Sequence, residues 1–272
     1  MLLSNLSKII KINKTYNFKK NKSFFEITAN SKLTNKKTLY IFDKNSKANT
    51  AYIKEAIKNN VPAIISNKYY KFIPIPQFIV SDIYEETNLL LKKIHKNYPK
   101  KTIAITGTNG KTSVVWYISK ILNFLKLDNS TVGTIGYYKN GKKINGLTLT
   151  TPAYEELFKY AASNNKKKTS IFIFEASSHA LDQNRLRDYP IDIAAITNIT
   201  RDHIDYHKSG SAYIKSKLML FTKHLLHNGH AIINSRIKNI ANLKKKLLKN
   251  NVDVIFFGKK NIFFELKMKV FS

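Results

Sequence analysis

The segment from Thr102 to Thr112 constrains this chain more than any other part of it, and it reads Thr-Ile-Ala-Ile-Thr-Gly-Thr-Asn-Gly-Lys-Thr. Residues 102–105 predict a short buried strand, and a loop with two glycines follows. From Val114 to Leu125 the apolar residues recur at helical spacing, which predicts a helix directly after the loop. A strand, a glycine loop, a Lys-Thr pair and a helix in this order are typical of a phosphate-binding loop.

The chemistry of this loop suits a nucleoside triphosphate. Glycines let backbone N–H groups approach phosphate oxygens, and the N-terminus of the next helix adds a partial positive charge. Lys111 can reach the outer phosphates, and the hydroxyl of Thr112 can ligate Mg²⁺. Because position 105 is Ile, the first glycine of a standard Walker A motif is missing, and an ordinary strand-to-helix turn is the alternative. The residues expected at the nucleotide are Gly107, Thr108, Asn109, Gly110, Lys111, Thr112 and Ser113.

Composition limits the class of protein. The 272 residues, 43% of them hydrophobic, suffice for about two domains. The absence of Cys excludes disulfides and thiolate metal sites, and it suits a reducing cytoplasm. No apolar run approaches the roughly 20 residues needed to cross a bilayer, and the N-terminus lacks the apolar core of a signal peptide. We therefore expect a cytoplasmic protein without a membrane partner.

The net charge of +30, from 47 basic and 17 acidic residues, would suit a protein that binds nucleic acid. Most of the basic residues are Lys, however, and they are scattered along the whole chain together with abundant Asn, Ile, Phe and Tyr. Codons for these residues are rich in A and T, so a biased genome is a sufficient explanation. We do not expect nucleic acid as the main partner, although a positive field could draw in anionic nucleotides.

The chain divides into two predicted units at the polar stretch of residues 96–101. The first unit should contain strands at 38–42, 61–65 and 78–80 and helices at 51–59 and 83–95. After the phosphate-binding loop and its helix, the second unit should contain strands at 131–138, 170–174, 191–196, 230–233 and 252–257, helices at 155–163 and 212–226, and a hairpin turn at Asn140-Gly141. Such alternation predicts a mostly parallel sheet with helices on both faces, whose chemistry lies beyond the carboxyl ends of the strands.

Polar side chains follow two of these strands directly. The strand at 170–174 runs into Glu175, and a carboxylate there could hold Mg²⁺ or a water opposite the phosphate loop. The strand at 191–196 precedes a cluster of Asp202, His203, Asp205 and His207, in which an imidazole could ligate a divalent ion. A surface salt bridge for Glu175 and a solvated loop for the cluster are the alternatives, and the preceding apolar strands favour function in both cases.

Three ordered motifs resemble the Mur ligases, in particular their MurE type. They occupy residues 107–112 (Gly-Thr-Asn-Gly-Lys-Thr), 175–181 (Glu-Ala-Ser-Ser-His-Ala-Leu) and 201–207 (Arg-Asp-His-Ile-Asp-Tyr-His). The second motif, followed by Gln183 and Arg185, disfavours the MurC, MurD and MurF types and folylpolyglutamate synthetase. The resemblance implies an α/β fold with an N-terminal uridine-nucleotide domain at 1–98 and a P-loop-type central domain at 99–272, with the family's C-terminal domain absent.

The resemblance also implies a reaction. ATP, with Mg²⁺, would phosphorylate the free carboxylate of UDP-N-acetylmuramoyl-L-alanyl-D-glutamate, and the amine of meso-diaminopimelate or L-lysine would then displace phosphate, in peptidoglycan synthesis. Three alternatives stay open. The chain could be a truncated, non-catalytic nucleotide-binding remnant, one half of a split ligase whose C-terminal domain is a separate chain, or a P-loop-like enzyme acting on another acidic substrate.

Residue roles follow from the same resemblance. It implies Lys111, Glu175, His203 and Lys217 as catalytic residues, with Thr112, Glu175, His203 and a carbamylated Lys217 as Mg²⁺ ligands. By composition alone, residues 213–221 predict only an amphipathic helix with exposed lysines. The substrate contacts implied are Thr150, Thr151, Ser177, Gln183 and Arg185.

Two implied contacts match the family only in part. Ser31 would face the uridine nucleotide, but it stands in Asn-Ser-Lys where the family has Asp-Ser-Arg. Asn234 would contact the nucleotide, but Ser235 and Arg236 follow it in place of the usual nearby aspartates.

Overall fold

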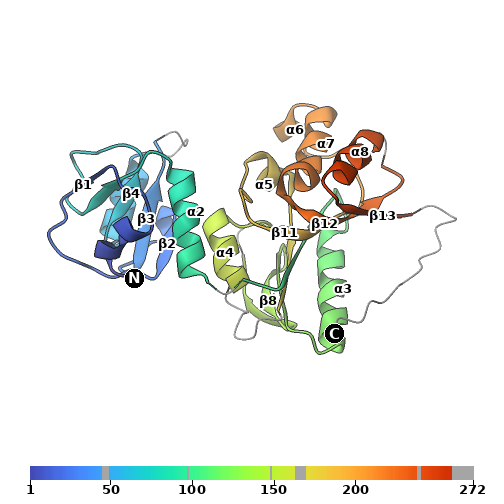
Figure 1. The fold of residues 1–272 in the computed structure, drawn as a ribbon, viewed down its shortest axis with the longest axis horizontal. Coiled ribbons are helices and arrows are strands. Elements are labelled where there is room, and N and C mark those ends of the chain that lie inside the picture. Colours follow the sequence, from blue (N-terminus) through green and yellow to red (C-terminus); the bar gives the residue numbers. More distant parts are fainter. Residues whose placement is uncertain (45–48, 97, 148, 163–169, 238–239, 259–272) are drawn as a thin grey trace. The chain divides into compact units, whose positions relative to one another are not determined.

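The computed structural model describes residues 1–44, 49–96, 98–147, 149–162, 170–237 and 240–258 (Figure 1). The chain forms two compact units, Met1–Tyr98 and Pro99–Ser272. Among the helices in the described ranges, none is long and apolar enough to cross a membrane.

The described part of the first unit is a five-stranded sheet with short helices. The strand order is β1-β5-β4-β3-β2, in which only the β1–β5 pair is antiparallel. Helix α2 begins where Asp82 accepts hydrogen bonds from the N–H groups of Tyr84 and Glu85, a typical helix start. The elements are η1 (Leu3–Lys8), β1 (Lys14–Tyr16), β2 (Glu26–Thr28), η2 (Ser31–Leu33), β3 (Thr38–Phe42), α1 (Ala51–Lys58), β4 (Ile64–Ser66), β5 (Gln77–Ile79) and α2 (Ile83–Ile94).

The described part of the second unit is an eight-stranded sheet in the order β13-β12-β11-β6-β10-β7-β8-β9. All neighbours from β13 to β7 are parallel, and β8 and β9 form the antiparallel hairpin predicted at Asn140-Gly141. Its elements begin with β6 (Lys101–Thr106), α3 (Lys111–Phe124), β7 (Asn129–Gly133), β8 (Gly136–Lys139), β9 (Lys142–Asn145), α4 (Tyr154–Ala162) and β10 (Ile171–Glu175). They continue with α5 (Ser178–Asp182), β11 (Ile191–Ile196), α6 (Ile204–His207), α7 (Gly210–Met219), η3 (Leu220–His224), β12 (Leu225–Asn234), α8 (Ala241–Lys249) and β13 (Asp253–Phe257).

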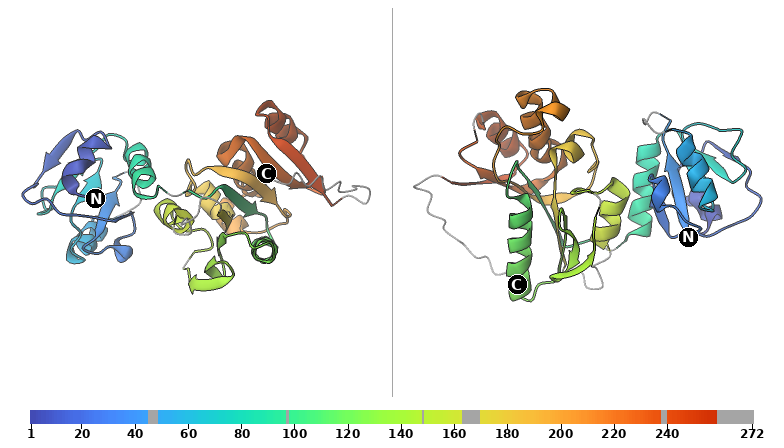
Figure 2. Two further views of the ribbon diagram at one scale, coloured as in Figure 1. Left: turned by 60° about the horizontal axis from the view of Figure 1, so that its bottom comes forward. Right: turned by 180° about the vertical axis from the view of Figure 1, so that it is seen from behind.

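Two apolar layers sandwich this sheet, so the prediction of an α/β fold with a mostly parallel sheet is confirmed. On one face Ile105 and Ile173 pack with Val115 of α3. On the other, Phe172 contacts the ring of Tyr189, which in turn contacts Phe158 of α4. Figures 1 and 2 show the strands of this unit lying between α3 and α4.

Strand β6 lies where the strand order of the sheet changes direction. Its neighbours are β10 on one side and β11 on the other, so the chain winds outward from β6 in both directions. The segments after β6, β10 and β11 therefore meet at one edge of the sheet, where ligands bind in open α/β folds.

Three sequence predictions were wrong in detail. The helix predicted at 212–226 ends at Met219, and the π-helical turn η3 leads into β12, which begins at Leu225 rather than at position 230. Pairing of Leu225 with Ile191 of β11 overrides the helical pattern there. The strand predicted at 131–138 is split into β7 and β8, and helix α8 was not predicted. The predicted helix end at position 163 and the tail at 259–272 lie outside the described residues.

The core between the sheet and α3 yields a stability prediction. Ile173→Ala removes a fully buried side chain, so we expect the free energy of unfolding to fall by about 2–5 kcal/mol. The matched control, Ile144→Ala in β9, changes a side chain that is 54% exposed and should cost less than about 1 kcal/mol. Urea denaturation followed by circular dichroism measures both, and equal losses would contradict the assignment of this core.

Candidate functional site

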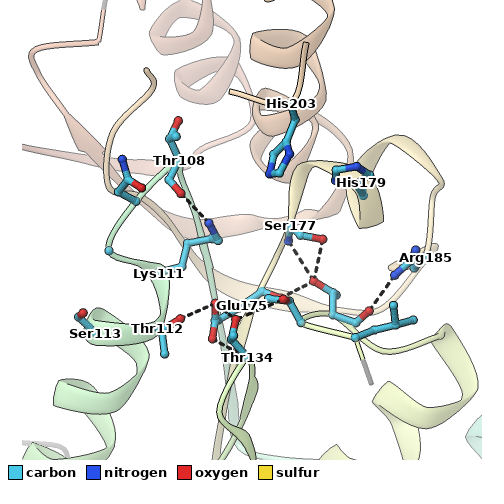
Figure 3. Close-up of a pocket in the computed structure, with 15 residues that line it drawn as sticks. Thr108, Lys111, Thr112, Ser113, Thr134, Glu175, Ser177, His179, Arg185 and His203 are labelled. Atoms are coloured by element: carbon cyan, nitrogen blue, oxygen red, sulfur yellow. Dashed lines mark hydrogen bonds between the residues drawn. The ribbon is translucent and has the colours of Figure 1, made fainter. Parts of the chain in front are cut away.

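A cavity of about 580 Å³ opens at the carboxyl edge of the second unit's sheet (Figure 3). It is bounded by the loop after β6, the end of β10, and the segments that follow β7 and β11. The lining residues are Thr108, Asn109, Gly110, Lys111, Thr112, Ser113, Thr134, Leu149, Thr150, Thr151, Glu175, Ser177, His179, Arg185 and His203. Most of the residues predicted for the nucleotide, the metal and the substrate thus lie around one cavity.

The loop between β6 and α3 has an open helix N-terminus. Helix α3 starts at Lys111 after Gly110, whose φ of 84° suits glycine, and among the described residues no side chain caps it. The first N–H groups of a helix lack intrahelical partners and carry a partial positive charge. This end of α3 can therefore bind an anion, as the sequence predicts.

The loop is held in shape by the segment after β11. Thr108 and Asn109 donate their backbone N–H groups to Asn198, both at 3.0 Å. A Cβ on Gly107 would lie 1.9 Å from the hydroxyl oxygen of Thr197, so no larger residue fits at position 107. These contacts hold the two strand-end segments together.

Lys111 lies over the loop. Its Nζ donates to the carbonyl oxygens of Gly107 and Thr108, each at 2.9 Å. Burial lowers the pKa of Lys111, while the charges of Glu175 and Asp202 oppose this effect. The side chain lines the cavity, so its charge is available to an anion bound there.

Glu175 is the buried carboxylate of the site, with 1% of its surface exposed. Its Oε2 accepts hydrogen bonds from the hydroxyls of Thr112, at 3.0 Å, and Thr134, at 3.2 Å. Its Oε1 accepts the backbone N–H of Thr134 at 2.8 Å. A Cβ on Gly133 would lie 2.1 Å from Oε1, so glycine is what lets the carboxylate fit between β7 and α3.

Lys217 reaches the underside of the loop from α7. It is 1% exposed, and its Nζ donates to the carbonyl oxygen of Gly107 at 2.7 Å. Burial, and secondly the charge of Lys111, lower the pKa of Lys217 to about 7. The prediction from composition alone, that the lysine at this position is exposed, is therefore wrong.

His203 lines the cavity in an unusual backbone conformation. Its φ of 49° is in the left-handed region, and its N–H donates to Oδ1 of Asp202 at 2.9 Å. Oδ2 of Asp202 lies 3.4 Å from Nε2 of His203, so the carboxylate can orient the ring. The ring of His179 contacts His203 edge-on, with centroids 4.9 Å apart.

The described residues contain no group of three or more His, Cys, Asp or Glu side chains arranged to hold a metal ion. Mg²⁺ is usually held in proteins by one or two protein oxygens together with water and phosphate oxygens. The hydroxyl of Thr112 and the carboxylate of Glu175 are such oxygens, and they are already in contact.

The other wall of the cavity joins the predicted substrate residues. Thr151 donates its hydroxyl to the carbonyl oxygen of Glu175 at 2.7 Å and accepts the N–H of Ser177 at 3.0 Å. The Nη1 group of Arg185 donates to the carbonyl oxygen of Thr151 at 3.0 Å. Thr150 lies beside Thr134, with hydroxyl oxygens 3.2 Å apart. Figure 3 shows Glu175 with Lys111 on one side and with Ser177 and Arg185 on the other.

Five predicted residues do not line the cavity. Gly107 belongs to the loop itself, Lys217 donates to its carbonyl oxygen, and Gln183 contacts Arg185. Asn234 donates to the carbonyl oxygen of Thr197 at 2.7 Å, so its side chain supports the residue that packs on Gly107. Ser31 belongs to the first unit, where it donates to Glu55 at 2.5 Å.

Sequence reasoning missed Gly133, Thr134, Leu149 and His179. Gly133 ends a strand that pairs with the strand ending in Glu175, and Thr134 follows it directly. That pairing cannot be read from a single sequence. His179 stands inside the motif at 175–181, but the resemblance implies no role for it.

The family model described as "Mur ligase middle domain" matches residues 105–270 of this chain. The chain is 36% identical to the UDP-N-acetylmuramoyl-L-alanyl-D-glutamate–2,6-diaminopimelate ligase of Rickettsia montanensis over 239 residues, which are 86% of this chain and 50% of that protein. It is 32% identical to the ligase of the same name from Buchnera aphidicola over 240 residues, which are 83% and 47% of the two chains. The chain spans about half the length of these curated relatives.

Solved structures show the same fold. One described as a UDP-N-acetylmuramoyl-L-alanyl-D-glutamate–2,6-diaminopimelate ligase has a TM-score of 0.68 at 24% identity, covering 86% of this chain and 48% of that one. MurF from Acinetobacter baumannii has a TM-score of 0.58 at 16% identity, with coverage of 86% and 48%.

The fit of Glu175 against Gly133 can be tested. In Gly133→Ala the new methyl group must displace the carboxylate from its hydrogen bonds, so the free energy of unfolding should fall by about 2–4 kcal/mol. The control is Gly146→Ala, where a Cβ meets nothing within 4 Å, and we expect a change within about 1 kcal/mol. If both variants unfold at the same urea concentration, Gly133 has no special role.

Proposed function

This chain belongs to the Mur ligase family, and we propose that it takes part in the ATP-dependent addition of an amino acid to UDP-N-acetylmuramoyl-L-alanyl-D-glutamate in peptidoglycan synthesis. The amino acid would be meso-diaminopimelate or L-lysine. The observation that carries the proposal is the open N-terminus of α3 beside the buried carboxylate of Glu175 in one cavity. The curated relatives, named as diaminopimelate ligases, support this substrate class.

The nucleotide would be ATP, held by the loop. The N–H groups at the start of α3 and the ammonium of Lys111 would bind its phosphates. The hydroxyl of Thr112 and the carboxylate of Glu175 would hold Mg²⁺, with His203 as a ligand of a second ion. When bound, Mg²⁺ would neutralise charge on the phosphoryl oxygens.

The opposite wall would bind the muramoyl dipeptide. The substrate carries free carboxylates, and Arg185 supplies the cation on that wall, next to Thr150, Thr151 and Ser177. A carboxylate oxygen of the substrate would attack the terminal phosphorus of ATP, releasing ADP and leaving an acyl phosphate. The amine of the amino acid would then attack the acyl carbon, and phosphate would leave. ATP and a UDP-linked substrate are cytoplasmic metabolites, so we place the reaction in the cytoplasm.

The environment of Lys217 suits carbamylation. Only an uncharged amine reacts with CO₂, and a pKa of about 7 leaves a large part of the Lys217 side chain uncharged near neutral pH. An ordinary lysine at that pH is almost wholly protonated. The product, a lysine carbamate, is an anion. It would lie next to the carbonyl oxygen of Gly107, where its negative charge could attract a divalent ion.

Carbamylation of Lys217 has a direct spectroscopic test. In ¹³C-labelled bicarbonate the protein should show a ¹³C carbamate resonance that grows as the pH rises through about 7, since deprotonation of Lys217 exposes the reactive amine. Lys217→Ala should lack this resonance and should lose turnover that bicarbonate does not restore. Lys215→Ala, which changes an exposed lysine of the same helix, is the control and should keep the resonance. A resonance that persists in Lys217→Ala would contradict the assignment.

The proposed reaction is tested by phosphate release. The assay contains the chain, ATP, Mg²⁺ and UDP-N-acetylmuramoyl-L-alanyl-D-glutamate, with meso-diaminopimelate or L-lysine, and is run with and without the C-terminal part of a curated relative added as a separate chain. We expect phosphate release that depends on both the dipeptide and the amino acid. Lys111→Ala should reduce this release at least about 100-fold, because the positive charge that stabilises the transferred phosphoryl group is lost. ATP binding without amino-acid-dependent release in either arm would instead favour a non-catalytic nucleotide-binding module.

A further inference from the structure

A chain of hydrogen bonds links Tyr206, in α6, to the guanidinium of Arg185. The hydroxyl of Tyr206 donates to Oδ2 of Asp182 at 3.1 Å and accepts from Nε2 of Gln183 at 3.0 Å. Oε1 of Gln183 in turn accepts from Nε of Arg185, at 2.8 Å, and from Nη2, at 2.5 Å. Arg185 completes the chain by donating Nη1 to the carbonyl oxygen of Thr151 at 3.0 Å.

The Tyr206 hydroxyl determines which way the Gln183 amide faces. An amide presents an acceptor oxygen on one side and a donor NH₂ group on the other. Arg185 has only donors, so it needs the oxygen side of the amide. Because the Tyr206 hydroxyl uses its own proton on Asp182, it offers Gln183 an acceptor and therefore selects the NH₂ side.

The hydrogen bonds among described residues leave a defined set of donors on Arg185. They use Nε–H, one N–H of Nη1 and one of Nη2, out of five N–H groups. One N–H remains on each terminal nitrogen. Arg185 lines the cavity, and two such donors match the two oxygens of a carboxylate.

Tyr206 also touches the cavity wall through its ring. The ring centroid lies 4.1 Å from that of His179, which lines the cavity and contacts His203. Tyr206 follows β11, whereas Gln183 and Arg185 follow β10. The tyrosine thus joins the segment that carries His203 to the segment that carries the substrate-facing arginine.

We propose that Tyr206 is a positioning residue which, through Gln183, fixes the guanidinium of Arg185 in the orientation that receives a carboxylate of the peptide substrate. The substrate class rests on the proposed function, whereas the link from Tyr206 to Arg185 does not. Gln183 then acts by orienting Arg185, which explains why it does not line the cavity although the sequence predicts a substrate contact.

The test compares the affinities of two ligands by calorimetry. UDP-N-acetylmuramoyl-L-alanyl-D-glutamate carries the peptide carboxylates, and UDP-N-acetylmuramate lacks the peptide. Tyr206→Phe keeps the ring and removes the hydroxyl, so affinity for the dipeptide ligand should fall roughly three- to tenfold, the size of one hydrogen bond. Affinities for UDP-N-acetylmuramate and ATP should stay unchanged. Tyr117→Phe, at a tyrosine 66% exposed on α3, is the control and should bind all ligands like the unmodified chain.

A second substitution separates orientation from general damage. In a Gln183→Leu background the amide that links the two residues is gone, so adding Tyr206→Phe should change the affinity for the dipeptide ligand by less than about twofold. Equal dipeptide affinity in Tyr206→Phe alone, a loss shared by all ligands, or a loss in the Gln183→Leu background as large as that of Tyr206→Phe alone would each overturn the proposal.

A measurement without ligand tests the link from Tyr206 to Arg185 independently of the proposed substrate. If the unmodified chain does not distinguish the two uridine ligands, the proposed substrate is wrong. The ¹⁵N NMR signal of the Arg185 Nε–H, identified by its loss in Arg185→Lys, still reports on the hydrogen bond to Gln183. Its exchange with water should be several-fold faster in Tyr206→Phe than in the unmodified chain, and unchanged exchange would overturn the link.

Discussion

The rest of the site depends on the buried carboxylate of Glu175. A charged group away from water is costly unless hydrogen bonds compensate it. Here the compensation comes from Thr112 at the start of α3 and from Thr134 after β7, so one side chain ties three segments together. The absence of a side chain on Gly133 makes the space for it. The position of α3 therefore depends on the same contacts that keep the carboxylate buried.

Lys111 balances this charge, and Lys217 contacts the same loop. Lys111 and Lys217 both donate to the carbonyl oxygen of Gly107, although two ammonium groups repel each other. Burial lowers the pKa of both side chains, and the charge of Lys111 further lowers the pKa of Lys217, to about 7. The overall excess of basic residues, which suggested nucleic acid at first sight, matters less than this local arrangement of two amines and one carboxylate.

The sequence predicted the parts of the structure that are encoded locally. The glycine loop, its strand and helix, and the hairpin at Asn140-Gly141 each depend on neighbouring residues, and the structure has them where expected. Glu175 could be singled out because an apolar strand precedes it. Thr134 and the buried state of Lys217 could not, since they depend on which strands pair and on how α7 packs under the loop. The early end of α7 has the same cause, because pairing of β12 with β11 overrides a local helical pattern.

A crystal structure of the chain with Mg²⁺ and a non-hydrolysable ATP analogue tests most directly whether the loop and Glu175 form a single nucleotide site. We expect the phosphates at the N-terminus of α3, with Lys111 at the outer phosphate and the ion in contact with the hydroxyl of Thr112. An analogue bound elsewhere, or no binding at millimolar analogue concentrations, would contradict this expectation.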